Sequence, residues 1–436
     1  MHDHQPHDPC ELLRWEAAQL QESGFDLGDL AAAAQQAVDD GDAAASRQLL
    51  NELLGVTRRN DWAFEEPEDL HSILASLHAP PPPAIIGEAA LLDRILGGWL
   101  GRCAGCNLGK PVENGDHWTA EHLRYYLELA DAYPLTDYIP VLDPMPESFE
   151  LREFWPYTTR GRIFESARDD DIDYTILGLH ILEQYGLGFT TADVAAEWLD
   201  RIPYTQTFTA ERVVYRNLAL GHAPVMAGKV DNPYREWIGA QIRADIFGYV
   251  HAGNPWAAAE LAYRDATLSH TANGVYGAMW AAALVAAAFT GDAKHSVQTS
   301  LACIPPRSRL AEAIRFVLDQ HAAGVTWHTA RTAIEERYGH YSWVHTINNA
   351  AVVVAGLLWG DGDFTASIGL TVQGGWDTDS NGATVGSVAG IITGAQRLPP
   401  HWTKPLNNTT RSAIRGFDRS RISDLADRTV LVANSK

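Results

Sequence analysis

The chain has 436 residues, of which 46% are apolar and 20% charged, the composition of a globular protein with a sizeable core. Its formal net charge of -22 argues against nucleic acid or an anionic membrane as the main partner. We find no long apolar run and no cationic start followed by an apolar stretch, so we expect neither a membrane span nor a signal peptide. The 4 cysteines make no disulfide framework and fit a cytoplasmic location.

Residues 1–79 predict a helical extension. Apolar residues recur at helical spacing over 12–20 and 30–38, and a third helix is expected over 43–54. A proline run follows, and because proline fixes φ and donates no hydrogen bond, we expect an extended spacer over 80–84. We place a second, larger domain at 85–436. We also expect the extension to lie beside the functional cleft and to narrow it.

Most segments of the larger domain predict helices, and alternating β patterns are scarce. The expected fold class is therefore all-α, a compact multi-helix domain. The expected helices cover 91–108, 173–185, 256–268, 273–289, 308–321, 347–358 and 381–397. Residues 131–168 interrupt this pattern with prolines and aromatic residues. Such a segment is either a binding lid or a packed surface excursion, and the sequence leaves both open.

The segment 374–382 concentrates oxygen donors just before a helix. Asp377 and Asp379 stand one residue apart, with Thr378 between them and Ser380 after them. Carboxylates and hydroxyls crowded in this way suit a hard cation such as Mg²⁺. Glycines recur every four residues from Gly382 onward, which allows this helix to pack closely against a neighbour.

A second acidic cluster lies far upstream and also precedes a helical pattern. It contains Asp169, Asp170, Asp171 and Asp173. The helix dipole stabilises carboxylates at a helix start without any metal, so capping is one interpretation. Carboxylates this close repel one another unless a cation or hydrogen-bond donors offset their charge, and we favour metal binding. Because both clusters stand at helix starts, we expect them to face each other in a helical bundle.

A glycine-rich stretch over 97–109 leads into Lys110 and Pro111. A phosphate-binding loop does not fit, because the upstream glycine is wrongly spaced and Pro111 stands where Ser or Thr would hold Mg²⁺. We expect a tightly packed helix that ends at Gly109, with Glu113 just beyond it. The CxxC spacing at 103–106 has no second pair, which favours buried thiols over a zinc site.

These three segments, in this order, resemble the motifs of the ADP-ribosylglycohydrolase family, and the resemblance covers about 85–398. That family has a GxxxGDALGxPxE-like helix, a TDDT-like acidic motif and a GGDTDT motif before a small-residue helix. Weaker likeness lies at Gly239-Ala240-Gln241-Ile242-Arg243 and at Leu268-Ser269-His270.

The resemblance implies an all-α glycosyl hydrolase that holds two Mg²⁺ ions, or Mn²⁺, at the bottom of a cleft. By resemblance, the metal ligands are Asp170, Asp171, Asp377, Asp379 and Ser380, to which we add Asp169 at the position of the family's first Thr. The residues expected to take part in catalysis are Glu113, Asp171 and Asp379. Those expected to bind substrate are His270, Gly239, Gln241, Arg243 and Trp376.

The implied reaction is cleavage of a glycosidic bond at ribose C1, which passes through an oxocarbenium-like state. Cations orient the ribose hydroxyls and lower the pKa of a bound water. A carboxylate such as Glu113 protonates the leaving group or deprotonates the water, and the sequence leaves open which carboxylate does which. The expected partner is an ADP-ribosylated substrate or a related small N-ribosyl molecule.

The chain also departs from the family pattern. Asp169 adds a charge, Ile172 removes a hydroxyl, Cys106 replaces an aspartate and Trp376 is inserted before Asp377. Residues 232–239 are bulky where family members have a glycine-rich loop for the diphosphate. Three alternatives stay open: a hydrolase of a smaller nucleoside-like N-glycoside, an inactive module that binds ADP-ribose or a nucleotide, and a helical scaffold whose acidic clusters only cap helices.

Overall fold

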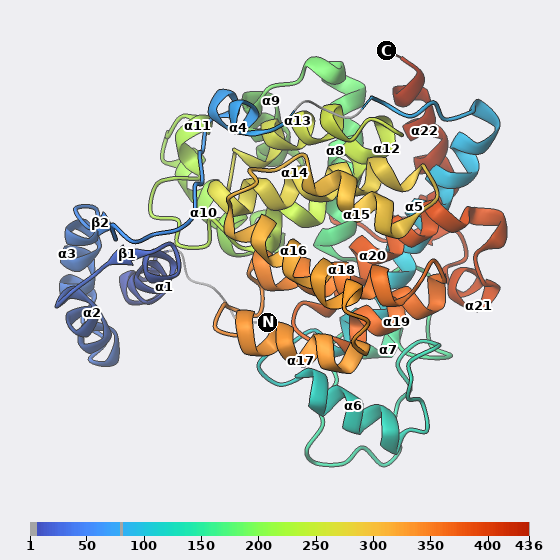
Figure 1. Ribbon diagram of the computed structural model, residues 1–436, viewed down its shortest axis with the longest axis horizontal. Helices are drawn as coiled ribbons and strands as arrows, with labels where there is room; N and C mark the ends of the chain where they lie inside the picture. Colours follow the sequence, from blue (N-terminus) through green and yellow to red (C-terminus); the bar gives the residue numbers. More distant parts are fainter. Residues whose placement is uncertain (1–6, 79–81, 436) are drawn as a thin grey trace.

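The computed structural model describes residues 7–78 and 82–435, and the described chain is almost entirely helical (Figure 1). The predicted all-α fold class is confirmed. Residues 80 and 81 of the expected spacer lie outside the described residues, and 82–84 have no regular secondary structure. No helix in the described ranges is long and apolar enough to span a bilayer.

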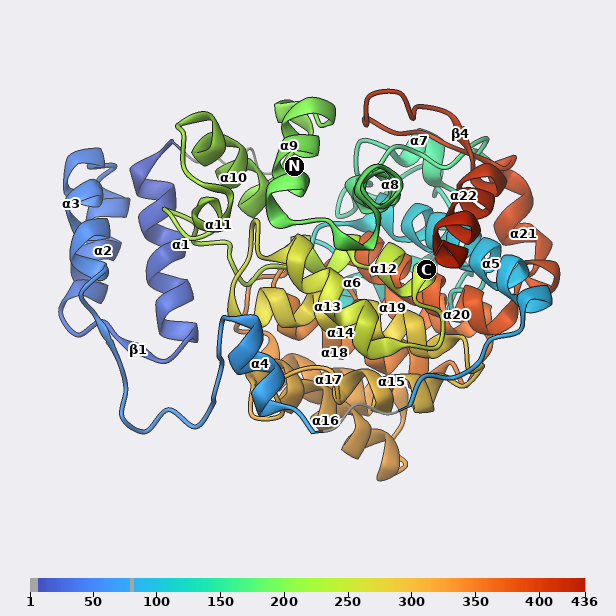
Figure 2. The ribbon, with the colours of Figure 1, turned by 90° about the horizontal axis from the view of Figure 1, so that it is seen from above.

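The N-terminal unit contains three helices that stand at one side of the molecule (Figure 2). They are α1 (Pro9–Glu22), α2 (Leu30–Asp39) and α3 (Ala43–Leu53), with β1 (Phe25–Asp26) paired antiparallel to β2 (Thr57–Arg58). Their apolar faces make a small core of their own. The next helix, α4 (Leu70–Ser76), instead buries Ile73 in the main core. The three helices predicted for the extension are therefore present.

The larger body is a stack of helices around one apolar core (Figure 1). Its helices are α5 (Glu88–Gly109), α6 (Ala120–Leu129), α7 (Trp155–Thr158), α8 (Asp170–Tyr185), α9 (Thr191–Arg201), α10 (Thr209–Ala219), α11 (Pro224–Ala227), α12 (Asp245–Val250), α13 (Pro255–Ala266), α14 (Ala272–Ala288), α15 (Ala293–Leu301), α16 (Arg309–Ala322), α17 (Trp327–Tyr338), α18 (Thr346–Trp359), α19 (Phe364–Gln373), α20 (Thr378–Thr393), α21 (Pro400–Thr403) and α22 (Ile422–Asn434).

Short 3-10 helices and one small hairpin complete the body. The 3-10 helices are η1 (Lys110–Val112), η2 (Gly186–Gly188), η3 (Tyr204–Gln206), η4 (Ile238–Arg243), η5 (Ala395–Arg397) and η6 (Lys404–Leu406), and the hairpin pairs β3 (Thr409–Thr410) with β4 (Ser420–Arg421). Each predicted helix of the body is present within a few residues of its expected bounds. The last one begins earlier than expected, at Thr378, so the helix start falls inside the acidic motif.

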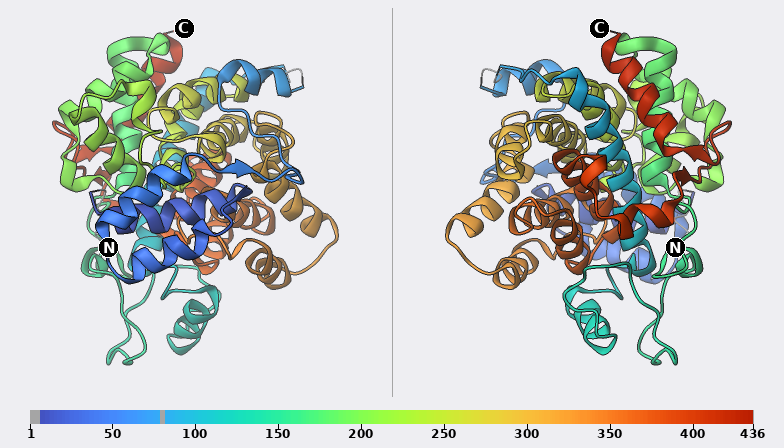
Figure 3. Two further views of the ribbon diagram at one scale, coloured as in Figure 1. Left: turned by 90° about the vertical axis from the view of Figure 1, so that its left-hand side faces the viewer. Right: turned by 90° about the vertical axis from the view of Figure 1, so that its right-hand side faces the viewer.

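Helices α5 and α20 pack side by side because glycine faces glycine along their contact (Figure 3). Gly97, Gly101 and Gly105 of α5 lie against Gly390, Gly386 and Gly382 of α20. A Cβ added to Gly105 would lie 1.9 Å from the Gly382 carbonyl oxygen, far inside van der Waals contact. The predicted close helix contact is confirmed. It brings the C-terminal end of α5 beside the N-terminal end of α20.

Residues 131–168 are irregular apart from α7, as predicted, and lie with α6 at the lower edge of the body in Figure 1. Tyr138 and Phe149 of this segment are buried. Arg152 and Arg168 reach the wall of the cavity described below. The segment therefore combines a packed excursion with two basic side chains at the cavity.

Candidate functional site

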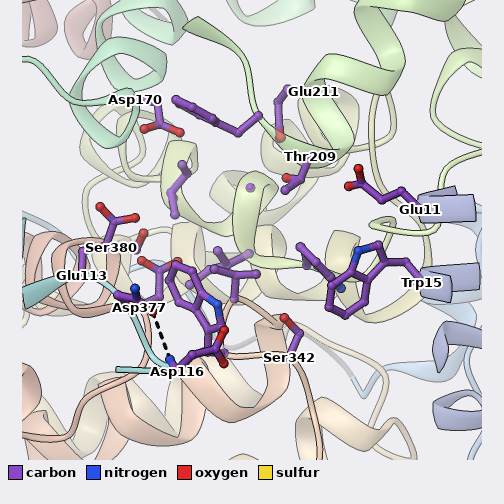
Figure 4. A pocket seen from close by; sticks show the side chains of 18 of the residues that line it. Glu11, Trp15, Glu113, Asp116, Asp170, Thr209, Glu211, Ser342, Asp377 and Ser380 are labelled. Carbon is purple, nitrogen blue, oxygen red and sulfur yellow. Dashed lines mark hydrogen bonds between the residues drawn. The ribbon is translucent and has the colours of Figure 1, made fainter. Parts of the chain in front are cut away.

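A cavity of about 1090 Å³ lies between the carboxylate clusters of the body and helix α1 of the N-terminal unit. In Figure 4, Asp170, Glu113 and Asp377 lie on one side of it, and Glu11 and Trp15 of α1 lie on the other. The cavity therefore has an acidic floor from the body and an outer wall from the extension. The expectation that the extension lies beside the cleft agrees with this arrangement.

The first carboxylate group comes from the touching ends of α5 and α20. Thr378 donates a hydrogen bond of 2.9 Å from its hydroxyl to the carbonyl of Gly109, which ties the two ends together. One carboxylate oxygen from each of Glu113, Asp377 and Asp379 lies within 4.8 Å of the other two. We call this set the Glu113 triad.

The second carboxylate group comes from the start of α8. Asp169 is the N-cap residue of α8, and its Oδ1 accepts a hydrogen bond of 3.0 Å from the Asp171 amide. Oxygens of Asp169, Asp171 and Asp379 again lie within 4.8 Å of one another, and we call this set the Asp169 triad. Ser380 joins it, because its hydroxyl donates to Asp171 Oδ2 at 3.1 Å. The two acidic motifs are thus brought together, with Asp379 in both sets.

Burial and mutual repulsion make these carboxylates hard to ionise. Burial, together with the charge of Asp169, raises the pKa of Asp170 to about 8 and that of Asp379 to about 6. The pKa values of Glu113 and Asp377 also rise well above the usual range, because both groups are buried and lie near Asp379. Asp169 is the exception. Although burial disfavours its charge, the neighbouring Lys110 ammonium holds the pKa of Asp169 at about 2.

The residues present fit a divalent cation. The donors are carboxylate and hydroxyl oxygens, which Mg²⁺ and Mn²⁺ prefer. Buried carboxylates with raised pKa values gain most from a cation that offsets their repulsion. Asp170, Asp171, Asp377, Asp379 and Ser380 all line the same cavity, together with Asp169 and Glu113.

The residues expected to bind substrate are placed differently from the carboxylates. Gly239 lines the cavity. Gln241, Arg243, His270 and Trp376 are buried and are not among the residues that line it in the described structure. Trp376 has φ of +63°, a strained conformation for a bulky residue, and the Arg331 guanidinium lies 4.2 Å from its ring centroid. The substrate roles of these four residues stay predictions.

Arg243 is held by acidic groups of the protein itself. Its guanidinium pairs with Glu211 at 2.9 Å and with Asp265, and it donates to the Ser269 hydroxyl at 2.8 Å. Ser269 in turn bonds His270 Nδ1 at 2.7 Å. Arg243 therefore does not line the cavity itself, but it holds Glu211, which does.

The bulky segment 232–239 is the docking surface for α1. Trp15 stands edge-on to Trp237, with ring centroids 5.0 Å apart. Arg235 donates two hydrogen bonds to Glu16, of 2.6 and 3.0 Å. Trp237 also lines the cavity. The departure from a glycine-rich loop thus coincides with the place where the extension joins the body.

Two basic residues contact the acidic residues of the site without having been predicted to do so, and Lys110 had been considered only as part of a phosphate-binding loop. Lys110 is buried and pairs with Asp169. Arg102 is fully buried, pairs with Asp245 at 2.7 Å and donates to the Asp171 carbonyl at 2.8 Å, so it anchors the start of α8. For Arg102 the sequence offered a signal, because a charged residue inside a glycine-rich, otherwise apolar helix needs a partner.

An all-α body that gathers acidic side chains on the floor of one cavity has the groups of a glycosyl hydrolase: proton-transferring carboxylates and oxygen donors for a cation. The chain belongs to the ADP-ribosylglycohydrolase family, whose model matches residues 87–436, and it is accordingly a glycosyl hydrolase enzyme. Among solved structures it is similar to one described as an "ADP-ribosylglycohydrolase-related protein complex", at 20% identity over 79% of this chain and 99% of that chain, with a TM-score of 0.49. No curated protein matches.

Proposed function

We propose that this enzyme uses a divalent cation, Mg²⁺ or Mn²⁺, to hydrolyse the glycosidic bond at ribose C1 of an ADP-ribosylated or related N-ribosyl substrate. The observation that carries the proposal is the meeting of the two acidic motifs on one cavity floor, with Asp379 common to both triads. Family membership supports the same reaction class.

The chain's own residues have distinct tasks in this proposal. The candidate oxygen donors for a cation are those of Asp377, Asp379, Asp170, Asp171 and Ser380, and a bound cation would supply charge stabilisation and a more acidic water. Glu113 transfers a proton, because its carboxyl lies beside the cation ligands and lines the cavity where the substrate enters.

A substrate panel tests the proposal. ADP-ribosyl-arginine, ADP-ribosyl-serine, O-acetyl-ADP-ribose and simple nucleosides are incubated with the enzyme and Mg²⁺ or Mn²⁺, and the released products are separated by chromatography. We expect turnover of at least one substrate, its loss with a chelator, and its loss in Asp379→Asn. Asp319→Asn, an exposed aspartate on α16, is the matched control. Full activity of Asp379→Asn would contradict the proposal.

A smaller N-riboside is the second candidate substrate, and the docking of α1 favours it. Arg235 is engaged with Glu16, and Trp237 with Trp15, so segment 232–239 is filled by protein contacts. A diphosphate needs several free backbone amides or basic groups at that place. Turnover of nucleosides together with rejection of ADP-ribosyl compounds in the panel would select this candidate.

A further inference from the structure

Lys110 places a positive charge inside the carboxylate centre. It is the first residue of η1, directly after the tightly packed end of α5, and its side chain is buried. Its ammonium donates to Asp169 Oδ2 and lies 4.7 Å from the ring centroid of Phe154. A buried ammonium is costly unless it is paired, so this pairing is a built feature of the floor.

Both carboxylate oxygens of Asp169 accept hydrogen bonds in this arrangement. Its Oδ2 accepts from Lys110, and its Oδ1 caps α8 by accepting from the Asp171 amide at 3.0 Å. Asp171 is likewise engaged, since Oδ2 accepts from Ser380 at 3.1 Å and Arg102 lies 3.5 Å from Oδ1. The Asp169 triad therefore already holds an ammonium, with a guanidinium at its edge.

The Glu113 triad is different. Among the described residues, no lysine, arginine or histidine forms an ion pair within 4.0 Å of Glu113, Asp377 or Asp379. Asp377 and Asp379 are buried and Glu113 is half-buried. With no basic partner in ion-pair contact these three carboxylates repel one another, and a divalent cation relieves that repulsion. The positive charge still needed by the site is thus needed at the Glu113 triad.

We propose that the Lys110 ammonium is a built-in cation of this site and replaces one of two divalent ions. The Asp169 triad then binds no metal, and the protein takes a single divalent cation at the Glu113 triad. Lys110 and Asp169 belong together in this scheme. Asp169 stands where the resemblance places a neutral Thr, so its extra negative charge is balanced by the extra positive charge of Lys110. This inference rests on the proposed cation-dependent function.

Metal stoichiometry tests the inference. Metal-free enzyme is dialysed against Mn²⁺, bound manganese per chain is measured by elemental analysis, and electron paramagnetic resonance distinguishes an isolated ion from a coupled pair. We expect one ion per wild-type chain, with the spectrum of an isolated ion. We expect two coupled ions in Lys110→Met/Asp169→Thr, in which a Thr hydroxyl still caps α8. Lys294→Met, at an exposed position, is the control and keeps one ion.

Each other outcome has a defined meaning. Two ions in the wild type overturn the inference and leave the proposed function standing. One ion in a double variant with unchanged circular dichroism and melting temperature also overturns it. No ion in the wild type overturns the proposed function itself. If the double variant does not fold, Lys110→Met alone serves, because its unpaired Asp169 carboxylate gains a cation and raises the count from one to two.

Discussion

Glu113 gives the sharpest single-residue prediction. Glu113→Gln keeps the shape of the side chain and removes its proton-transferring carboxyl, so kcat falls by roughly 10²–10⁴. The melting temperature does not fall, because the change also removes one of several carboxylates that repel one another. Steady-state kinetics with Mg²⁺ and a thermal melt measure both quantities.

Glu121→Gln is the matched control for that variant. Glu121 is exposed in the first turn of α6, away from the cavity, and its replacement leaves kcat unchanged. A Glu113→Gln enzyme with wild-type kcat would show that proton transfer belongs to another group.

The sequence indicated the acidic residues that the fold brings together at one cavity, but it did not indicate their basic partners. Asp170, Asp171, Asp377 and Asp379 stand in local motifs at helix starts, so spacing alone brings out their chemistry. The pairing of Lys110 with Asp169 joins positions 59 residues apart and exists only once α5 and α8 are packed. Arg243 shows the converse, because its local motif resembles a binding stretch while tertiary contacts engage it with buried acids.

The contact between α5 and α20 sets the geometry of the floor, and it depends on glycine. A Cβ at Gly101 would lie 2.1 Å from the Gly386 carbonyl oxygen, so Gly101→Ala must push the helices apart. We expect a loss of about 3 kcal/mol in the free energy of unfolding. Urea denaturation followed by circular dichroism measures it.

Gly188→Ala provides the comparison, because nothing lies within 4 Å of a Cβ placed at that exposed glycine. Its free energy of unfolding stays within about 0.5 kcal/mol of wild type. Equal stabilities of the two variants would mean that the helices separate without cost.

Helix existence was predictable where one apolar face repeats over several turns, as in α13 and α16. The boundary of α20 was not, because Thr378 and Asp379 are polar residues inside the first turn, and the sequence pattern marks the helix only where small apolar residues begin. The docking of α1 could not be predicted either. Trp15 and Trp237 are separated by about half the length of the chain, and no local pattern connects them.

The end of α1 carries a pH-dependent contact. Burial, and then the charge of Glu236, raises the pKa of Glu22 from 4.5 to about 8, against the opposing effect of Arg309. His345 also faces it, with Nε2 3.9 Å from a Glu22 oxygen. The folded chain keeps a proton on Glu22 that the unfolded chain loses above pH 4.5. Stability therefore falls as pH rises from 4.5 to about 8, by about 1 kcal/mol per pH unit.

Glu22→Gln removes this titration. The variant is expected to lose less stability than wild type between pH 5 and pH 8, and to be the more stable protein at pH 8. Thermal melts of both proteins across this range measure the difference. Parallel pH profiles would show that Glu22 ionises freely in the folded protein.

At the scale of the whole chain, the cavity is lined by both the N-terminal unit and the larger body. The family model begins at residue 87, whereas the outer wall comes from α1, before that point. The body supplies the carboxylate floor, and the extension supplies the surface opposite it (Figure 4). On the proposed function we therefore expect the body to set the reaction class and α1 to limit the size of the substrate, so that a change in α1 alters the second without the first.

Trp15 is the residue at which that separation can be measured. It lines the cavity and stands edge-on to Trp237, so Trp15→Ala removes part of the outer wall and about 2 kcal/mol of packing. With a wider entrance, kcat/KM for an ADP-ribosylated peptide rises relative to that for a nucleoside. This ratio rises about tenfold for each 1.4 kcal/mol by which the intact wall disfavoured the peptide. Leu54→Ala, an exposed change just after α3, leaves this ratio unchanged. If folded Trp15→Ala shows the wild-type ratio, the α1 wall does not exclude the larger substrate, and the body alone limits the size of the substrate.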